Sequence, residues 1–99
     1  MGTLNVIDAE RITRYLDTTR RAVAKVQVIA PARSYAARMA EDFLRMATSY
    51  LADAEHNHAQ GDDVLAFAQV NYAHGWLDAG ARLGIFDVDE DDRLFTLAD

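Results

Sequence analysis

The chain has no cysteine among its 99 residues, and it contains only one proline. Without thiols there is no disulfide, thiolate nucleophile or thiolate metal ligand, so packing alone must stabilise the fold. A reducing cytoplasm suits such a protein. No apolar run approaches the ~20 residues of a membrane span, and the first residues lack the apolar segment of a signal peptide. We therefore expect a soluble, cytoplasmic protein that has no membrane partner.

Basic residues are also scarce, since ten lysines and arginines stand against sixteen acids and leave a net charge of −6. A negative field repels a phosphate backbone, so we expect no nucleic-acid partner. The hydrophobic fraction is 51%, alanine is abundant, and a chain of this length suits one core. These features predict a single all-α domain over residues 1–99, with a lead at 1–7 and an acidic tail at 87–99.

Apolar residues recur every three or four positions, as on one face of a helix. The pattern predicts an antiparallel, up-down three-helix bundle over about residues 8–28, 31–60 and 62–84. Asp8 is a good N-cap for the first helix, and Pro31 suits the first turn of the second. Gly61 suits the end of the second helix, and Asp62 can cap the third.

The third helix is apolar on two sides, and such a helix needs two neighbours. One face, which we expect to pack on the first two helices, carries Leu65, Ala68, Tyr72, Trp76, Ala79 and Leu83. Glycine inside a helix costs roughly 1 kcal/mol relative to alanine, so close helix contact should compensate for two glycines here. The second surface, which we expect to meet a partner chain, comprises Val70, Gly75, Leu77, Gly80 and Ala81.

A polar strip lies between these faces and is formed by Asn71, His74, Asp78 and Arg82. Gly75 leaves a gap beside it, so an amide, an imidazole, a carboxylate and a guanidinium could converge on a small polar molecule. The alternative is a surface ion pair between Asp78 and Arg82, with Asn71 bonded to a neighbouring helix. No nucleophile is evident, and we assign no catalytic residue.

The remaining motifs do not fit a metal or cofactor site, and we expect neither a metal nor a cofactor. His58 and Asp62 are four residues apart, but Gly61 between them should end the helix. The tail sequence DVDEDD lacks the glycine at the sixth position and the bidentate glutamate at the twelfth that an EF-hand needs. No phosphate loop or Rossmann glycine pattern is present. The tail residues Leu94, Phe95 and Leu97 either form a strap that folds back onto the bundle or remain a frayed end.

The stretch from Gly61 to Phe86 resembles an archaeal family of small helical proteins, domain of unknown function 357, and the resemblance extends back to about residue 8. It is carried by Gly61, Asp62, Ala66, Asn71, Tyr72, Ala73, Gly75, Leu77, Asp78, Gly80, Leu83 and Gly84. The resemblance implies a compact all-helical domain of a cytoplasmic archaeal protein, and the acidic balance would suit a high-salt cytoplasm. No activity is established for that family, so it supplies no site residues.

Two functions remain open. The first is a protein-interaction or scaffolding module that self-associates, most simply as a dimer, through the third helix. The second is a small polar-ligand binder, or an accessory subunit of an enzyme, that uses the polar strip. An enzyme in its own right ranks third. A crevice over Gly75 that contains the polar side chains would favour the ligand binder, whereas a continuous hydrophobic contact there would dismiss it.

Overall fold

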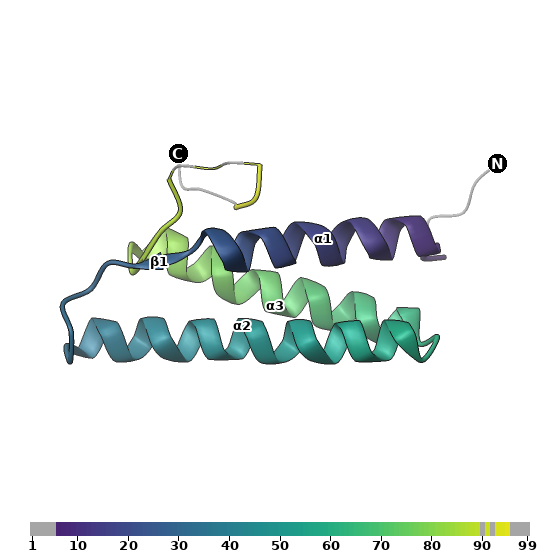
Figure 1. The fold of residues 1–99 in the computed structure, drawn as a ribbon, viewed down its shortest axis with the longest axis horizontal. Helices are drawn as coiled ribbons and strands as arrows, with labels where there is room; N and C mark the ends of the chain where they lie inside the picture. The colour runs from purple at the N-terminus through teal and green to yellow at the C-terminus, as the bar shows by residue number, and fades with distance from the viewer. Residues whose placement is uncertain (1–5, 90, 92, 96–99) are drawn as a thin grey trace.

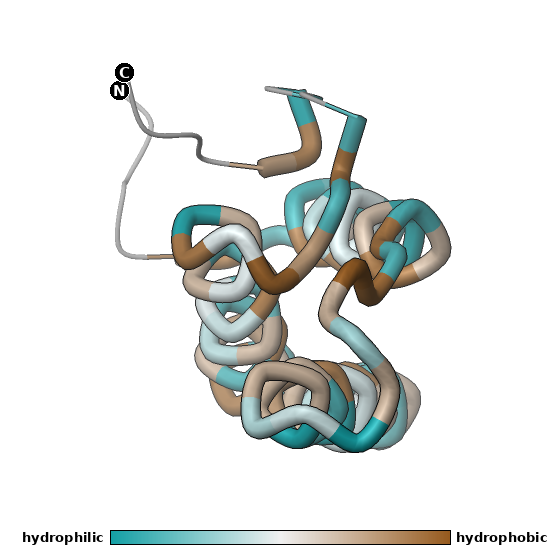
Figure 2. The backbone as a smooth tube through the Cα atoms, turned by 90° about the vertical axis from the view of Figure 1, so that its left-hand side faces the viewer, coloured by the Kyte–Doolittle hydropathy of each residue, from teal (hydrophilic) through white to brown (hydrophobic). Residues whose placement is uncertain are grey.

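The computed structural model describes residues 6–89, 91 and 93–95. In this part of the chain three helices make up nearly all of the regular structure: α1 (Ala9–Lys25), α2 (Tyr35–Ala59) and α3 (Asp63–Leu83). The helices α1 and α3 run in the same direction and α2 runs in the opposite one (Figure 1). Seen along the bundle, they lie at the corners of a triangle (Figure 2). The predicted all-α, up-down three-helix bundle is confirmed.

The ends of the helices follow local signals in the sequence. Asp8 accepts a hydrogen bond of 2.8 Å from the backbone N–H of Arg11, and Asp62 accepts one of 3.1 Å from that of Leu65. Gly84, with φ of 78°, ends α3 in the left-handed conformation that glycine adopts without strain. Both predicted N-caps are therefore confirmed.

The connection between α1 and α2 differs from the prediction. α1 ends at Lys25 rather than at residue 28, because β1 (Gln27–Val28) pairs in antiparallel register with β2 (Phe86–Asp87). α2 begins at Tyr35 rather than at Pro31, since the Ser34 side chain caps it by accepting a bond of 3.0 Å from the N–H of Ala37. The partner of β1 lies far along the chain, so helical periodicity could not reveal it.

The two apolar faces of α3 differ in burial from the prediction, although Trp76 packs against the core as predicted. Val70 and Leu77, predicted to meet a partner chain, are 1% and 0% exposed and lie in the core of the single chain. Ala81 is partly buried against the same core. By contrast, Tyr72 and Leu83, predicted to be core, are 51% and 60% exposed. The assignment of Val70 and Leu77 to a surface interface was therefore wrong.

Small residues explain which face of α3 turns inward. On α2, three alanines spaced by seven are fully buried: Ala40, Ala47 and Ala54. On α3, buried small residues recur at the same spacing: Ala66, Ala73 and Gly80. Both helices therefore bury a line of small residues, and on α3 this line lies beside the buried side chains of Val70 and Leu77. We call these six residues the small-residue seam.

The two helical glycines predicted at a partner interface have different surroundings. A Cβ at Gly80 would overlap the ring of Phe86, which is 3% exposed. Gly80 therefore permits a close contact within the chain. A Cβ at Gly75 would have no heavy atom within 4 Å other than its local neighbours, so no other helix of the same chain packs closely there, and a contact with a partner chain at Gly75 stays a prediction.

The chain after α3 folds back beside the bundle. Of this segment, Val88, Leu94 and Phe95 are buried against residues of all three helices. Of the two alternatives for the tail, the described residues form the strap, and we use that name for residues 86–89, 91 and 93–95. Leu97 lies outside the described residues. None of the described helices is both long and apolar enough to cross a membrane.

Alanine substitutions at the two glycines should change stability in opposite directions. Gly75→Ala should raise the free energy of unfolding by up to about 1 kcal/mol, because alanine favours the helix and meets open space. Gly80→Ala should lower it by about 1–3 kcal/mol, because the Phe86 ring must move. Urea denaturation followed by circular dichroism measures both. Equal effects at the two positions would contradict the packing described for Phe86.

Candidate functional site

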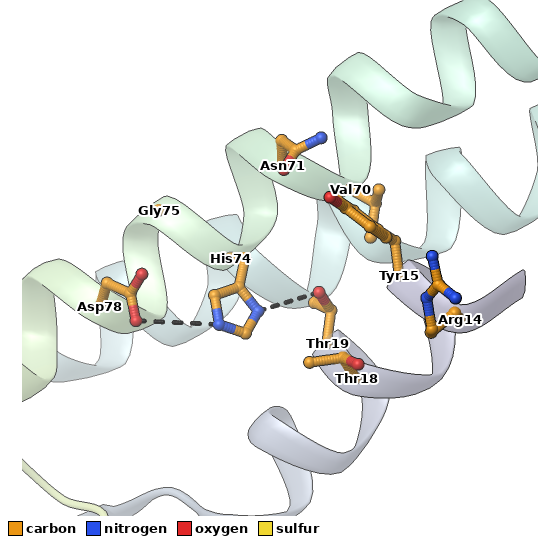
Figure 3. Close-up of a pocket in the computed structure, with 9 residues that line it drawn as sticks. All are labelled: Arg14, Tyr15, Thr18, Thr19, Val70, Asn71, His74, Gly75 and Asp78. Atoms are coloured by element: carbon orange, nitrogen blue, oxygen red, sulfur yellow. Dashed lines mark hydrogen bonds and ion pairs between the residues drawn. The ribbon is translucent and has the colours of Figure 1, made fainter. Parts of the chain in front are cut away.

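A pocket lies between α1 and α3, with a volume of about 350 Å³. Its lining comes from five α3 residues, Val70, Asn71, His74, Gly75 and Asp78, and from four α1 residues, Arg14, Tyr15, Thr18 and Thr19. Figure 3 shows His74 and Thr19 in the middle, with Arg14 and Asp78 toward opposite ends. Gly75 is one of the lining residues, and a Cβ at this position would meet open space.

The structure brings together three of the four predicted ligand-binding residues. Asn71, His74 and Asp78 line the pocket, whereas Arg82 is exposed and lies outside it. The α1 contribution was missed. Its signal was the polar pair Thr18 and Thr19, which interrupts the apolar stripe of the first helix. The guanidinium in the pocket belongs to Arg14 instead of Arg82.

His74 has partners at both ring nitrogens. Nε2 lies 2.6 Å from the backbone carbonyl oxygen of Leu94, and Nδ1 lies 2.9 Å from the hydroxyl oxygen of Thr19. A carbonyl oxygen can only accept, so Nε2 must carry the hydrogen. In the neutral ring Nδ1 therefore accepts the hydroxyl hydrogen of Thr19, which is 2% exposed. This chain of hydrogen bonds connects α1, α3 and the strap.

Asp78 places a carboxylate next to the imidazole. Its Oδ1 lies 3.7 Å from Nε2 of His74, and its side chain is 23% exposed. At this distance the carboxylate adds negative charge beside the ring rather than a short hydrogen bond. The pocket therefore has a partly buried anion at one end.

The remaining lining combines amide, hydroxyl and apolar surfaces. Asn71 donates from Nδ2 to the backbone carbonyl of Phe67 at 2.9 Å, so its oxygen is the atom that can accept from a ligand. The Tyr15 ring packs against Phe67 with centroids 4.9 Å apart, and Val70 is 1% exposed. These contacts fix an apolar wall beside the polar groups.

The strap is anchored through Asp91. Oδ1 of Asp91 accepts hydrogen bonds from the backbone N–H groups of Arg93 and Leu94 at 3.0 and 3.2 Å, and Oδ2 lies 3.5 Å from Nζ of Lys25. Burial alone would raise the pKa of Asp91, but these hydrogen bonds and the charges of Lys25 and Arg93 outweigh it and lower the pKa below its ordinary value. Ionised Asp91 thus positions the Leu94 carbonyl that His74 contacts.

His58 lies at the α2–α3 corner and is paired with a carboxylate. Nδ1 of His58 lies 2.7 Å from Oδ1 of Asp63, while the neighbouring Asp62 caps α3. Among the residues that the structure describes, no group of three or more His, Asp or Glu side chains is placed to hold a metal ion. The His58–Asp63 pair stabilises the turn between the two helices.

Fold and pocket together define a small three-helix domain with a polar cleft between its parallel helices and a C-terminal strap. A family model described as protein of unknown function, DUF357, matches residues 14–86, and the chain belongs to this family. The match spans every lining residue of the pocket but ends before Leu94. No curated protein and no solved structure matches the chain.

The anchor of the strap should titrate in acid. Because the pKa of Asp91 is lowered in the folded protein, its stabilising effect is complete above the ordinary range near pH 4 and is lost as the pH falls through the lower folded value. The amide shifts of Arg93 and Leu94 should follow this titration in nuclear magnetic resonance spectra between pH 6 and 2.5. Asp91→Asn should abolish the titration. Asp89→Asn, at an exposed side chain, should preserve it, and a midpoint above the ordinary value would contradict the assignment.

Proposed function

We propose that this protein binds a small polar molecule in the pocket between α1 and α3. The observation that carries the proposal is the crevice over Gly75, into which polar side chains converge from two helices. A continuous hydrophobic contact at this place would have argued against ligand binding. The proposal covers a binding protein or an accessory subunit of an enzyme, and the absence of cysteine supports a cytoplasmic location.

The dimensions and chemistry of the pocket support this function. Its volume of about 350 Å³ falls within the range of small-molecule sites, which extends from roughly 300 to 1,000 Å³. The lining combines the apolar ring of Tyr15 with hydrogen-bonding groups such as Thr18 and Asn71. Since His74 is held by two hydrogen bonds, its part of the wall is organised before any ligand enters.

Filling the pocket should abolish binding. Amide chemical shifts of the wild-type protein, recorded with pools of polar metabolites, should change together at Thr18, Asn71 and Gly75 for the pool that contains a ligand. Gly75→Phe should remove this response, because its ring would occupy the crevice, whereas Gly75→Ala should retain it. If no pool shifts these amides, or if the phenylalanine variant responds like the wild type, the protein does not use this pocket.

A second candidate function is self-association through the exposed side of α3. Leu65, Tyr72 and Leu83 are 44%, 51% and 60% exposed, and their spacing places them on one line of the helix. We call these three residues the outer stripe. Its neighbour is α2, because the rings of Tyr72 and Tyr50 lie 4.6 Å apart. An exposed apolar line of this kind supports a dimer contact, at residues other than those first predicted.

The outer stripe gives a direct test of self-association. Light scattering at tens of micromolar should show a dimer for the wild type, and the double variant Leu65→Lys, Leu83→Lys should be a monomer because charge is placed on both ends of the stripe. Val64→Lys is the matched control, since Val64 is 76% exposed but points about a quarter turn away from the stripe. A strictly monomeric wild-type protein would rule out the dimer.

A further inference from the structure

We propose that the ligand of the α1–α3 pocket is an elongated dipolar molecule, with an anionic group at the Arg14 end and an ammonium group at the Asp78 end. This inference rests on the proposed ligand-binding function and specifies the ligand class. The observation behind it is that one guanidinium and one carboxylate line opposite ends of the same pocket (Figure 3).

The separation of the two charges follows from the register of the helices. α1 and α3 run in the same direction, and the bond of 2.9 Å between Thr19 and His74 sets these two residues level. Arg14 lies five positions before Thr19, and Asp78 lies four positions after His74. At 1.5 Å per residue, the backbone positions of Arg14 and Asp78 are therefore about 13 Å apart along the bundle. The Asp78 carboxylate points toward His74, and Arg14 lies at the other end beyond the Tyr15 ring (Figure 3), so a ligand of several bonds is needed to reach both charges.

The middle of the pocket suits an uncharged segment. The Tyr15 ring offers apolar surface there, and Gly75 contributes no side chain that would block the path. Because both nitrogens of His74 already have partners in the protein, the ring closes the wall without adding a third charged contact. A short aliphatic chain between the two charged ends fits this lining.

A ligand with charge of only one sign fits less well. A multiply charged anion would meet the Asp78 carboxylate and a chain of net charge −6, with one arginine in the pocket to oppose them. A simple cation would offer no anionic group to the Arg14 guanidinium. A carboxylate has two oxygens and about four acceptor positions, so Asp78 can accept from an ammonium group in addition to the contacts that it makes within the protein, such as the one with His74.

Three probes of similar length separate the possibilities: 6-aminohexanoate, hexanoate and hexylammonium, titrated at matched ionic strength while pocket amide shifts are recorded. The dipolar probe should bind at least about tenfold more tightly than either singly charged probe. Arg14→Gln should weaken 6-aminohexanoate and hexanoate but not hexylammonium. Asp78→Asn should weaken 6-aminohexanoate and hexylammonium but not hexanoate. Neither substitution removes a core side chain, since Arg14 is exposed and Asp78 becomes its near-isostere.

The outcomes distinguish this inference from the function on which it rests. If hexanoate or hexylammonium binds as tightly as the dipolar probe, the dipolar ligand class is wrong but ligand binding in the pocket stands. If none of the three probes shifts the pocket amides, the ligand class is also wrong. In that case the metabolite pools and the Gly75→Phe variant decide separately whether the pocket binds anything.

Discussion

The packing of the Phe86 ring against Gly80 is the constraint on which the other features at this end of the bundle depend. Gly80 is the last of three small residues, after Ala66 and Ala73, that are buried at a spacing of seven along α3. At one end of the seam, Gly80 leaves room for the ring of Phe86. Phe86 then belongs to β2, whose pairing with β1 ends α1 early and starts the strap. One missing side chain thus sets the path of the chain at that end of the bundle.

The fold class could be predicted because its signals are local. Asp62 accepts a bond from an N–H three residues away, and Gly84 ends α3 through its own backbone conformation, so neither depends on distant residues. The inward face of α3 could not be predicted from periodicity, because Leu77 and Tyr72 mark two apolar sides equally well. The available signal for the inward face was the spacing of seven residues between small side chains such as Ala66 and Ala73, since small residues are readily buried where helices pack.

Only the α3 side of the pocket could be predicted from the sequence. Asn71, His74 and Asp78 share one line of α3, and helical geometry alone places them together. Arg14 could not be added without the register between α1 and α3, which the Thr19–His74 contact sets. The Leu94 carbonyl was still less accessible to sequence reasoning, because a backbone group carries no residue signature.

The geometry changes the role of His74. It belongs to the predicted ligand-binding strip, yet one nitrogen of its imidazole donates to the Leu94 carbonyl and the other accepts from the buried hydroxyl of Thr19. A ligand that bonded to the ring would have to break one of these contacts, and a buried Thr19 hydroxyl left unpaired costs roughly 1–3 kcal/mol. A ligand that bonds to Arg14 or to the Asn71 oxygen does not leave the Thr19 hydroxyl unpaired. His74 is therefore better suited to hold the pocket wall and the strap in register than to bind the ligand itself.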